Sequence, residues 1–325
     1  MKRILPTWMH NVLRIIRAAI SYTNESIYWY WMELTNCSII PNEKSELANL
    51  MIKSHVLEKG ITMPNRRLGF GYDRVRALIT WTNEAIKKYS PNRIEIQTTL
   101  NVLDQYFQIH KTANFQLPDD IHFGITQLLK YKTFETSICY ETNSIDYFSK
   151  TKDFKDFAHQ RHSVRWYDKN NKIDKATLLD AIQLAQTAPS ACNRQSTKVY
   201  IVEDEEKKQK ILELQNGNRG FGFAADKIIL LTADMRYWFY RERTFAFLDA
   251  GIFCMNILYA LHYYKIGACT LNAHLYKKQR KILQNLIGYD KAEMPVVFIA
   301  IGNVPEKFKV CGSQRIETGQ MCKFV

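Results

Sequence analysis

The segment RTFAFLDAGIFCMNILYALHYY, residues 243–264, constrains the fold more than any other part of the chain. Drawn as a helix, it is apolar on almost every side, so it predicts a central helix surrounded by a large core. Asp249 and His262 interrupt it and its flanks are those of a globular chain, so we do not expect it to span a membrane. A chain of 325 residues is long enough for such a core and for about two domains.

The second half of the chain alternates between helical and strand patterns. In addition to the apolar helix, a helix is predicted over residues 174–188, with Asp174 as its N-cap. Runs of β-branched and apolar residues predict strands over residues 198–204, 226–234, 265–272 and 294–303. The spacing alone does not separate a parallel sheet from a mixed one.

The first half of the chain has a different pattern. Helical periodicity predicts helices over residues 45–59, 73–89 and 92–111. Ser45 and Asp73 are the N-cap candidates of the first two, and no convincing strand pattern precedes about residue 150. We therefore expect a helical N-terminal domain of unknown role, residues 1–150, followed by an α+β domain, residues 151–325.

The first 22 residues, MKRILPTWMHNVLRIIRAAISY, require a separate check for targeting. Their apolar run is cut by His10, Arg14 and Arg17, so it predicts neither a signal peptide nor a transmembrane segment. Apolar side chains recur at helical spacing at Val12, Ile15, Ile16, Ala19 and Ile20. We expect this face to pack on the protein's own core, and contact with a membrane surface is the alternative.

Charge and cysteine usage limit the partners and the compartment. The chain has 45 basic and 32 acidic residues, a formal net charge of +13 that is spread over both halves. A diffuse positive field favours anionic ligands such as nucleotides, acidic membranes or nucleic acid without choosing among them. Seven scattered cysteines without a C-x-x-C pair argue against a disulfide framework or a zinc site. They fit a reducing cytosol, so we expect a cytoplasmic protein.

Most familiar catalytic motifs are missing, and three short segments remain as candidates. There is no Gly-rich dinucleotide fingerprint, no P-loop and no nucleophile elbow, and the histidines are too scattered for a metal site. The candidates are RHSVRWYD (161–168), APSACNRQS (188–196) and GACTLN (267–272). Each segment also has a purely structural interpretation: the first could be a charged turn, the second a loop that ends a helix, and the third a tight turn in the core. Alternatively, guanidinium forks and a hydroxyl suit a phosphate, amides supply hydrogen bonds, and small residues let a flat ring approach.

Taken in order with their spacings, these segments and MPVVFIAIGNVPEKFKVCGSQR (294–315) resemble the FMN-dependent nitroreductase family over roughly residues 155–316. The resemblance implies a mixed, largely antiparallel sheet wrapped by helices, and a homodimer with FMN at the subunit interface. It also implies an oxidoreductase that takes hydride from NAD(P)H and passes electrons to a small organic acceptor at the same site. We expect no nucleic-acid partner.

The resemblance also implies which residues contact FMN. Arg161, His162 and Ser163 would hold the phosphate and ribityl end, and Arg165 would reach the N1–C2 carbonyl edge of the isoalloxazine ring. Guanidinium groups suit a phosphate, and a cation at N1–C2 favours the negative charge of the reduced cofactor. The other implied contacts are the loop residues Ser190 and Asn193, the ring-facing residues Thr270, Leu271 and Asn272, the late phosphate-binding Arg315, and the weaker candidate Lys309. No general acid or base is implied.

The chain departs from the family in ways that affect the acceptor and the dimer. Gln195-Ser196-Thr197 stands where many members have Gln-Pro-Trp, and only ten residues follow Arg315. In the first half, HVLEKGITMPNRRLGFG (55–71) resembles an extension of nitroreductase-like proteins from bacterial surface-polysaccharide gene clusters. That second resemblance leaves an alternative open, a non-catalytic or partner-dependent role in polysaccharide biosynthesis.

Overall fold

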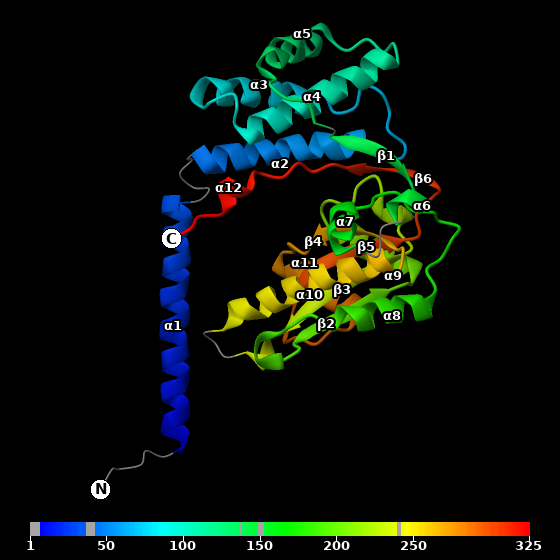
Figure 1. Ribbon diagram of the computed structural model, residues 1–325. Helices are drawn as coiled ribbons and strands as arrows, with labels where there is room; N and C mark the ends of the chain where they lie inside the picture. Colours follow the sequence, from blue (N-terminus) through cyan, green and yellow to red (C-terminus); the bar gives the residue numbers. More distant parts are fainter. Residues whose placement is uncertain (1–6, 37–42, 137, 149–152, 239–241) are drawn as a thin grey trace.

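Figure 1 shows the computed structural model of the chain, in which a helical N-terminal part lies beside an α+β part. The structure describes residues 7–36, 43–136, 138–148, 153–238 and 242–325. The elements of the first part are α1 (Thr7–Asn36), α2 (Glu43–Ile61), α3 (Tyr72–Lys88), α4 (Ile94–Thr112), α5 (Asp119–Leu128) and the 3₁₀ turn η1 (Leu129–Tyr131).

The remaining elements build the second part. Its strands are β1 (Cys139–Asn143), β2 (Thr197–Val202), β3 (Lys227–Asp234), β4 (Gly267–Asn272), β5 (Glu293–Gly302) and β6 (Lys307–Cys311). Its α-helices are α6 (Ser144–Tyr147), α7 (Phe154–Gln160), α8 (Lys175–Ala185), α9 (Glu205–Leu214), α10 (Arg243–Tyr263), α11 (Lys277–Ile287) and α12 (Thr318–Met321). Its 3₁₀ turns are η2 (Ala191–Asn193), η3 (Gly222–Ala224) and η4 (Met235–Tyr237).

Four strands form an antiparallel sheet in the order β2-β3-β5-β4. On one face Ile257 of α10 packs with Ile229 and Ile299 of the two central strands, and α8 adds to the same cluster. On the other face Ile211 of α9 and Leu283 of α11 join the second core cluster. The prediction of an α+β fold with a largely antiparallel sheet wrapped by helices is therefore confirmed.

The predicted helices are confirmed, but two of their predicted caps are wrong. Helix α8 does begin after Asp174, whose side chain accepts the N–H of Thr177 (2.9 Å). Helix α2 already begins at Glu43, ahead of Ser45. Helix α3 begins after Gly71, whose positive φ of 70° suits glycine, so that Asp73 lies inside the first turn. An acidic side chain there still stabilises the helix through the macrodipole.

Strand β1 was not predicted, and it connects the two parts of the molecule. Cys139–Asn143 pairs antiparallel with Lys307–Cys311 from the other end of the chain. The short sequence CYETN lacks a repeating apolar pattern, because this strand is specified by its partner rather than by its own periodicity. After β6 the chain runs along α2 (Figure 1), where the N–H of Ser313 donates to Glu58 (3.0 Å). The division of domains at about residue 150 stays a prediction.

Helix α10 is not enclosed on all sides. The expectation of a central helix surrounded by the core is therefore wrong for a single chain. Ala246, Ala250 and Ile257 are buried. The exposed apolar side chains of the helix are Phe245, Phe247, Leu248, Ile252, Met255 and Tyr263. By length and composition, the stretch Thr244–Tyr263 could cross a membrane, and 33% of it is buried inside the fold. Core helices of soluble proteins can have the same length and composition, so a single such helix is weak evidence for a membrane span.

Helix α1 stands apart from the rest of the chain (Figure 1). Val12, Ile15, Ile16 and Ile20 are between 45% and 69% exposed. The expectation that this apolar face packs on the protein's own core is therefore wrong. No other element in the described part of the chain covers it.

Gly302 tests how β5 holds the RHSVRWYD segment. A Cβ at this position would lie 2.7 Å from Cδ1 of Tyr167, a buried ring. The hydroxyl of Tyr167 donates to the carbonyls of Val164 (2.8 Å) and Ala300 (3.0 Å), so the ring has little room to move. Gly302→Ala should lower the free energy of unfolding by roughly 1–3 kcal/mol, the usual cost of overpacking.

Gly319→Ala is the matched control. Gly319 is exposed in α12 and nothing lies within 4 Å of the Cβ it would gain, so alanine should raise stability by roughly 0.5–1 kcal/mol. Urea unfolding of both variants checks the pair. Equal effects at the two glycines would contradict the contact between Tyr167 and Gly302.

Candidate functional site

The RHSVRWYD segment begins where α7 ends and continues beside β4. Val164 bridges Val310, and its N–H donates to the carbonyl of Ala268 in β4 (2.9 Å). The side chain of Val164 is buried in the core. Successive side chains of an extended segment point to opposite sides, so Ser163 and Arg165 share the other side, where both interact with the thiol of Cys269.

Arg165 is a buried cation without a carboxylate partner. It is 8% exposed, and no ion pair in the described part of the chain includes it. Its Nη1 donates to Sγ of Cys311 (3.4 Å), and its Cζ lies 5.9 Å from the ring centroid of Phe221. Its Nε is buried and has no hydrogen-bond partner among the described residues. A buried guanidinium nitrogen without an acceptor is costly, which favours a ligand as the missing acceptor.

Two further cations of the predicted site lie around His162. The Nε of Arg161 is buried without a partner among the described residues, as in Arg165. Arg315 is exposed and donates to the carbonyl of Ser313 (2.6 Å). Burial, and then the fields of Arg161 and Arg315, hold the pKa of His162 below its usual value. His162 is therefore neutral near pH 7, and its Nε2 lies 3.0 Å from the hydroxyl of Tyr140.

Strand β4 presents the third predicted segment at the edge of the sheet. Thr270 and Asn272 are exposed, whereas Leu271 points into the core. Asn272 donates through Nδ2 to the carbonyl of Asn216 (2.8 Å), and its own carbonyl accepts from Nε2 of Gln215 (3.1 Å). The loop that follows α9 is thereby fixed beside the predicted site, which the sequence did not indicate.

Two of the predicted contacts, Ser190 and Asn193, lie away from Arg165 within one chain, and a third, Lys309, has another partner. Lys309 forms an ion pair with Glu141 (2.8 Å). Ser190 accepts the N–H of Gln195 (3.1 Å) in the loop before β2, beside the buried Asp249 of α10. Strands β2 and β4 are opposite edges of the sheet, three strand spacings or ~14 Å apart. Asn193 lies in the same loop, and its side chain is outside the described residues.

The end of α2 reaches the site from the N-terminal part. The indole Nε1 of Trp166 donates to the carbonyl of Thr62 (2.6 Å), and Oγ1 of Thr62 lies 3.4 Å from Sγ of Cys311. Nζ of Lys59 donates to the carbonyl of Gly217 (3.3 Å). These contacts were not predicted, and the only signal in the sequence was the second resemblance over residues 55–71.

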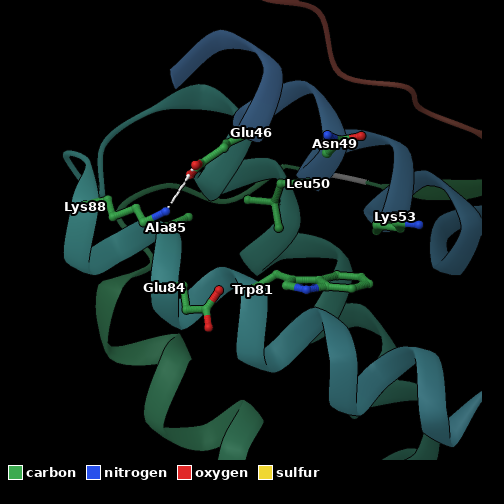
Figure 2. Close-up of a pocket in the computed structure, with 8 residues that line it drawn as sticks. All are labelled: Glu46, Asn49, Leu50, Lys53, Trp81, Glu84, Ala85 and Lys88. Atoms are coloured by element: carbon green, nitrogen blue, oxygen red, sulfur yellow. Dashed lines mark hydrogen bonds and ion pairs between the residues drawn. The ribbon is translucent and has the colours of Figure 1, made fainter. Parts of the chain in front are cut away.

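Two cavities lie on α2, and only one of them adjoins the predicted site. The larger, ≈ 480 Å³, lies between α2 and α3, where Lys88 pairs with Glu46 (2.9 Å) beside Trp81 (Figure 2). None of the predicted site residues lines it. The smaller, ≈ 390 Å³, lies between the end of α2 and the loop after α9, and we call it the junction pocket. Its lining residues are Val56, Leu57, Lys59, Gly60, Met63, Phe70, Gly71, Arg74, Asn216, Gly217 and Arg219.

The donors of the RHSVRWYD segment suit the FMN that the resemblance implies. The positive fields of Arg161 and Arg315 both reach His162, so the two guanidinium groups lie close to the same point. Such a cluster of positive charge suits a phosphate group. The Nε atoms of Arg161 and Arg165 are donors that lack acceptors among the described residues. The loop with Ser190 lies at the other edge of the sheet, so a single chain supplies only part of the implied contacts.

Comparison with known families agrees with this geometry. The model of the Nitroreductase family matches residues 158–218 and 213–303, somewhat less than half of the chain. This part of the chain is nitroreductase-like. It contains the RHSVRWYD segment, the loop with Ser190 and strand β4, and it ends before Lys309 and Arg315.

Two curated relatives are similar over shorter stretches. YdgI of Bacillus subtilis (strain 168), which is named as an NAD(P)H nitroreductase, is 31% identical over 97 residues, 30% of this chain and 46% of its own. The CLA biosynthesis enone reductase of Lactiplantibacillus plantarum is 36% identical over 92 residues, 28% of this chain and 42% of its own. The chain thus spans less than half the length of either relative.

Solved structures with a similar fold cover about half of this chain. The enone reductase CLA-ER is 23% identical, with a TM-score of 0.48, and the match covers 54% of this chain and 98% of that one. A nitroreductase in complex with FMN from Exiguobacterium sibiricum 255-15 is 18% identical, with a TM-score of 0.47 and coverage of 54% and 98%.

Replacement of Arg165 by an apolar side chain tests whether its charge serves the fold. A buried guanidinium without a carboxylate contributes little to stability, because its desolvation is not offset by an ion pair. Arg165→Met should therefore leave the free energy of unfolding of the FMN-free protein unchanged or raise it by about 1 kcal/mol, measured by urea unfolding. A loss of several kcal/mol would show that the guanidinium is a structural element.

Lys227→Met is the control for a buried cation that does serve the fold. Lys227 is 7% exposed and pairs with the buried Asp226 (2.8 Å). Its replacement leaves that carboxylate in the core, so the variant should lose about 3 kcal/mol, near the low end of the usual range because Lys172 still contacts Asp226 (3.2 Å).

Proposed function

We propose that this protein is an FMN-dependent oxidoreductase that passes electrons from NAD(P)H to a small organic acceptor. The observation that carries the proposal is the buried, unpaired guanidinium of Arg165 beside β4. It lies inside the segment that matches the nitroreductase family. The names of the two relatives, an NAD(P)H nitroreductase and an enone reductase, support the same class of reaction.

The roles of the residues follow from their chemistry and position. Arg161 and Arg315 bind the phosphate of FMN, with His162 and Ser163 toward the ribityl chain. Arg165 donates to the N1–C2 edge of the ring, and its permanent charge stabilises the negative charge that reduction places there. The bound FMN supplies the transfer of hydride and electrons. Phe221 and the end of α2 exclude water from Arg165, which strengthens its field at the ring.

We also propose that the active unit is a homodimer in the cytoplasm. The exposed apolar side of α10, with Leu248 and Ile252, offers a surface for a second copy. A partner is needed in any case if Ser190 and Asn193 are to approach the same FMN as Arg165, since they lie at opposite edges of the sheet. The six cysteines in the described part of the chain are all outside disulfides, which suits a reducing compartment.

The absorption spectrum of the purified protein tests the proposed function. It should show bound flavin, identified as FMN after extraction, and the colour should bleach when NAD(P)H is added without oxygen. A colourless protein that ignores added FMN would contradict the proposal and favour a non-catalytic role for the fold.

Arg161→Ala tests the phosphate contact within the same proposal. Loss of a hydrogen bond to a charged group costs roughly 1.5–3 kcal/mol, so the Kd for FMN should rise about ten- to a hundredfold. Riboflavin, which lacks the phosphate, is the control ligand and should bind wild type and variant almost equally. Unchanged FMN affinity would place the phosphate elsewhere.

A further inference from the structure

The junction pocket gathers positive charge without a counter-ion. Lys59, Arg74 and Arg219 line it, and no aspartate or glutamate does. None of the three takes part in an ion pair within the described part of the chain, and the contact recorded for Lys59 is the carbonyl of Gly217 (3.3 Å). A concave surface lined by charges of one sign concentrates ions of the other sign.

The electrostatics of Lys59 agree with this geometry. Burial, and then the field of Arg165, hold the pKa of Lys59 below its usual value, and Arg74 adds to the same effect. Lys59 is thus exposed to the positive fields of both Arg165 and Arg74, and Arg219 lines the same pocket. An anion placed among them would relieve their mutual repulsion.

Apolar side chains also line the junction pocket. They belong to Val56, Leu57, Met63 and Phe70. The volume, ≈ 390 Å³, lies within the range of small-molecule sites in proteins. A ligand that suits both the cations and the apolar side chains of this lining has an apolar body and an anionic group.

The junction pocket adjoins the proposed flavin site. Asn216 lines the pocket and accepts a hydrogen bond from Asn272 of β4 (2.8 Å). Lys59 lines it as well and lies close enough to Arg165 for the two charges to interact. A molecule bound in the pocket would therefore lie beside the proposed FMN ring.

We propose that the junction pocket binds the carboxylate or phosphate group of the electron acceptor, an organic anion with an apolar body. Arg74 and Arg219 hold the anionic group together with Lys59, and the apolar side chains of the lining hold the body. The N-terminal part thereby supplies half of the acceptor site and sets its specificity. The identification of the bound anion as the electron acceptor rests on the proposed function. The anion site itself can be tested without it.

Binding of simple anions to the full-length protein tests the site directly. Isothermal titration calorimetry would use benzoate and phenyl phosphate as anionic probes and benzyl alcohol as the neutral one. The two anions should bind more tightly than the alcohol, and the tighter of them identifies the preferred group. Arg74→Gln together with Arg219→Gln should weaken the anions at least about tenfold and leave the alcohol unchanged.

Arg76→Gln is the matched control for these variants. Arg76 is on α3, two residues after Arg74, but it pairs with Asp120 (2.6 Å) and does not line the pocket. It should leave anion binding unchanged. Equal binding of the anions to wild type and the double variant would overturn the proposal, as would a wild type that binds neither anion.

Turnover separates this proposal from the proposed function. With NAD(P)H as donor, the double variant should raise the KM for 4-nitrobenzoate at least about tenfold while that for 4-nitrobenzyl alcohol stays unchanged. If the protein binds the anions but no flavin, the anion site in the junction pocket is supported and the proposed oxidoreductase function is contradicted. A double variant that loses FMN instead of anion affinity would overturn the inference, because the cations would then serve the cofactor.

Discussion

The arrangement of the site depends on one buried charge that forms no ion pair in the described part of the chain. Arg165 is held by the thiol of Cys311 and the ring of Phe221, and its Nε has no acceptor in the described part of the chain. The segment around it is fixed by Tyr167, whose hydroxyl bonds across to β5. Desolvation of such a cation is costly unless something offsets it, and in the proposed function the FMN ring does so.

The N-terminal part borders the candidate site through direct contacts. Strand β1 pairs with β6, and the end of α2 contacts Trp166 and Cys311, so the helical part lies directly on the RHSVRWYD segment. Burial of Arg165 is thus a joint product of both ends of the chain. Any acceptor that reaches the proposed flavin from this side meets side chains of α2 and α3.

The sequence predicted the parts of the fold that local periodicity specifies. The strand pattern of 226–234 and the helix after Asp174 both appear as expected, because apolar repeats and caps act within a few residues. Tertiary pairing was not predictable in this way. The pairing of Lys309 with Glu141, the docking of α2 on Trp166 and the exposed side of α10 each depend on residues far apart in the chain. Arg165 was identified by resemblance, but only the structure shows that its Nε has no acceptor among the described residues.

A redox titration of the flavin in wild type and Arg165→Gln tests the central claim most directly. Glutamine keeps a donor at the N1–C2 edge but removes the charge that favours the reduced cofactor. The midpoint potential should fall by some tens of millivolts, since about 30 mV corresponds to about 1.4 kcal/mol for a two-electron couple. An unchanged or raised potential would contradict the account, because Arg165 would then not face the flavin.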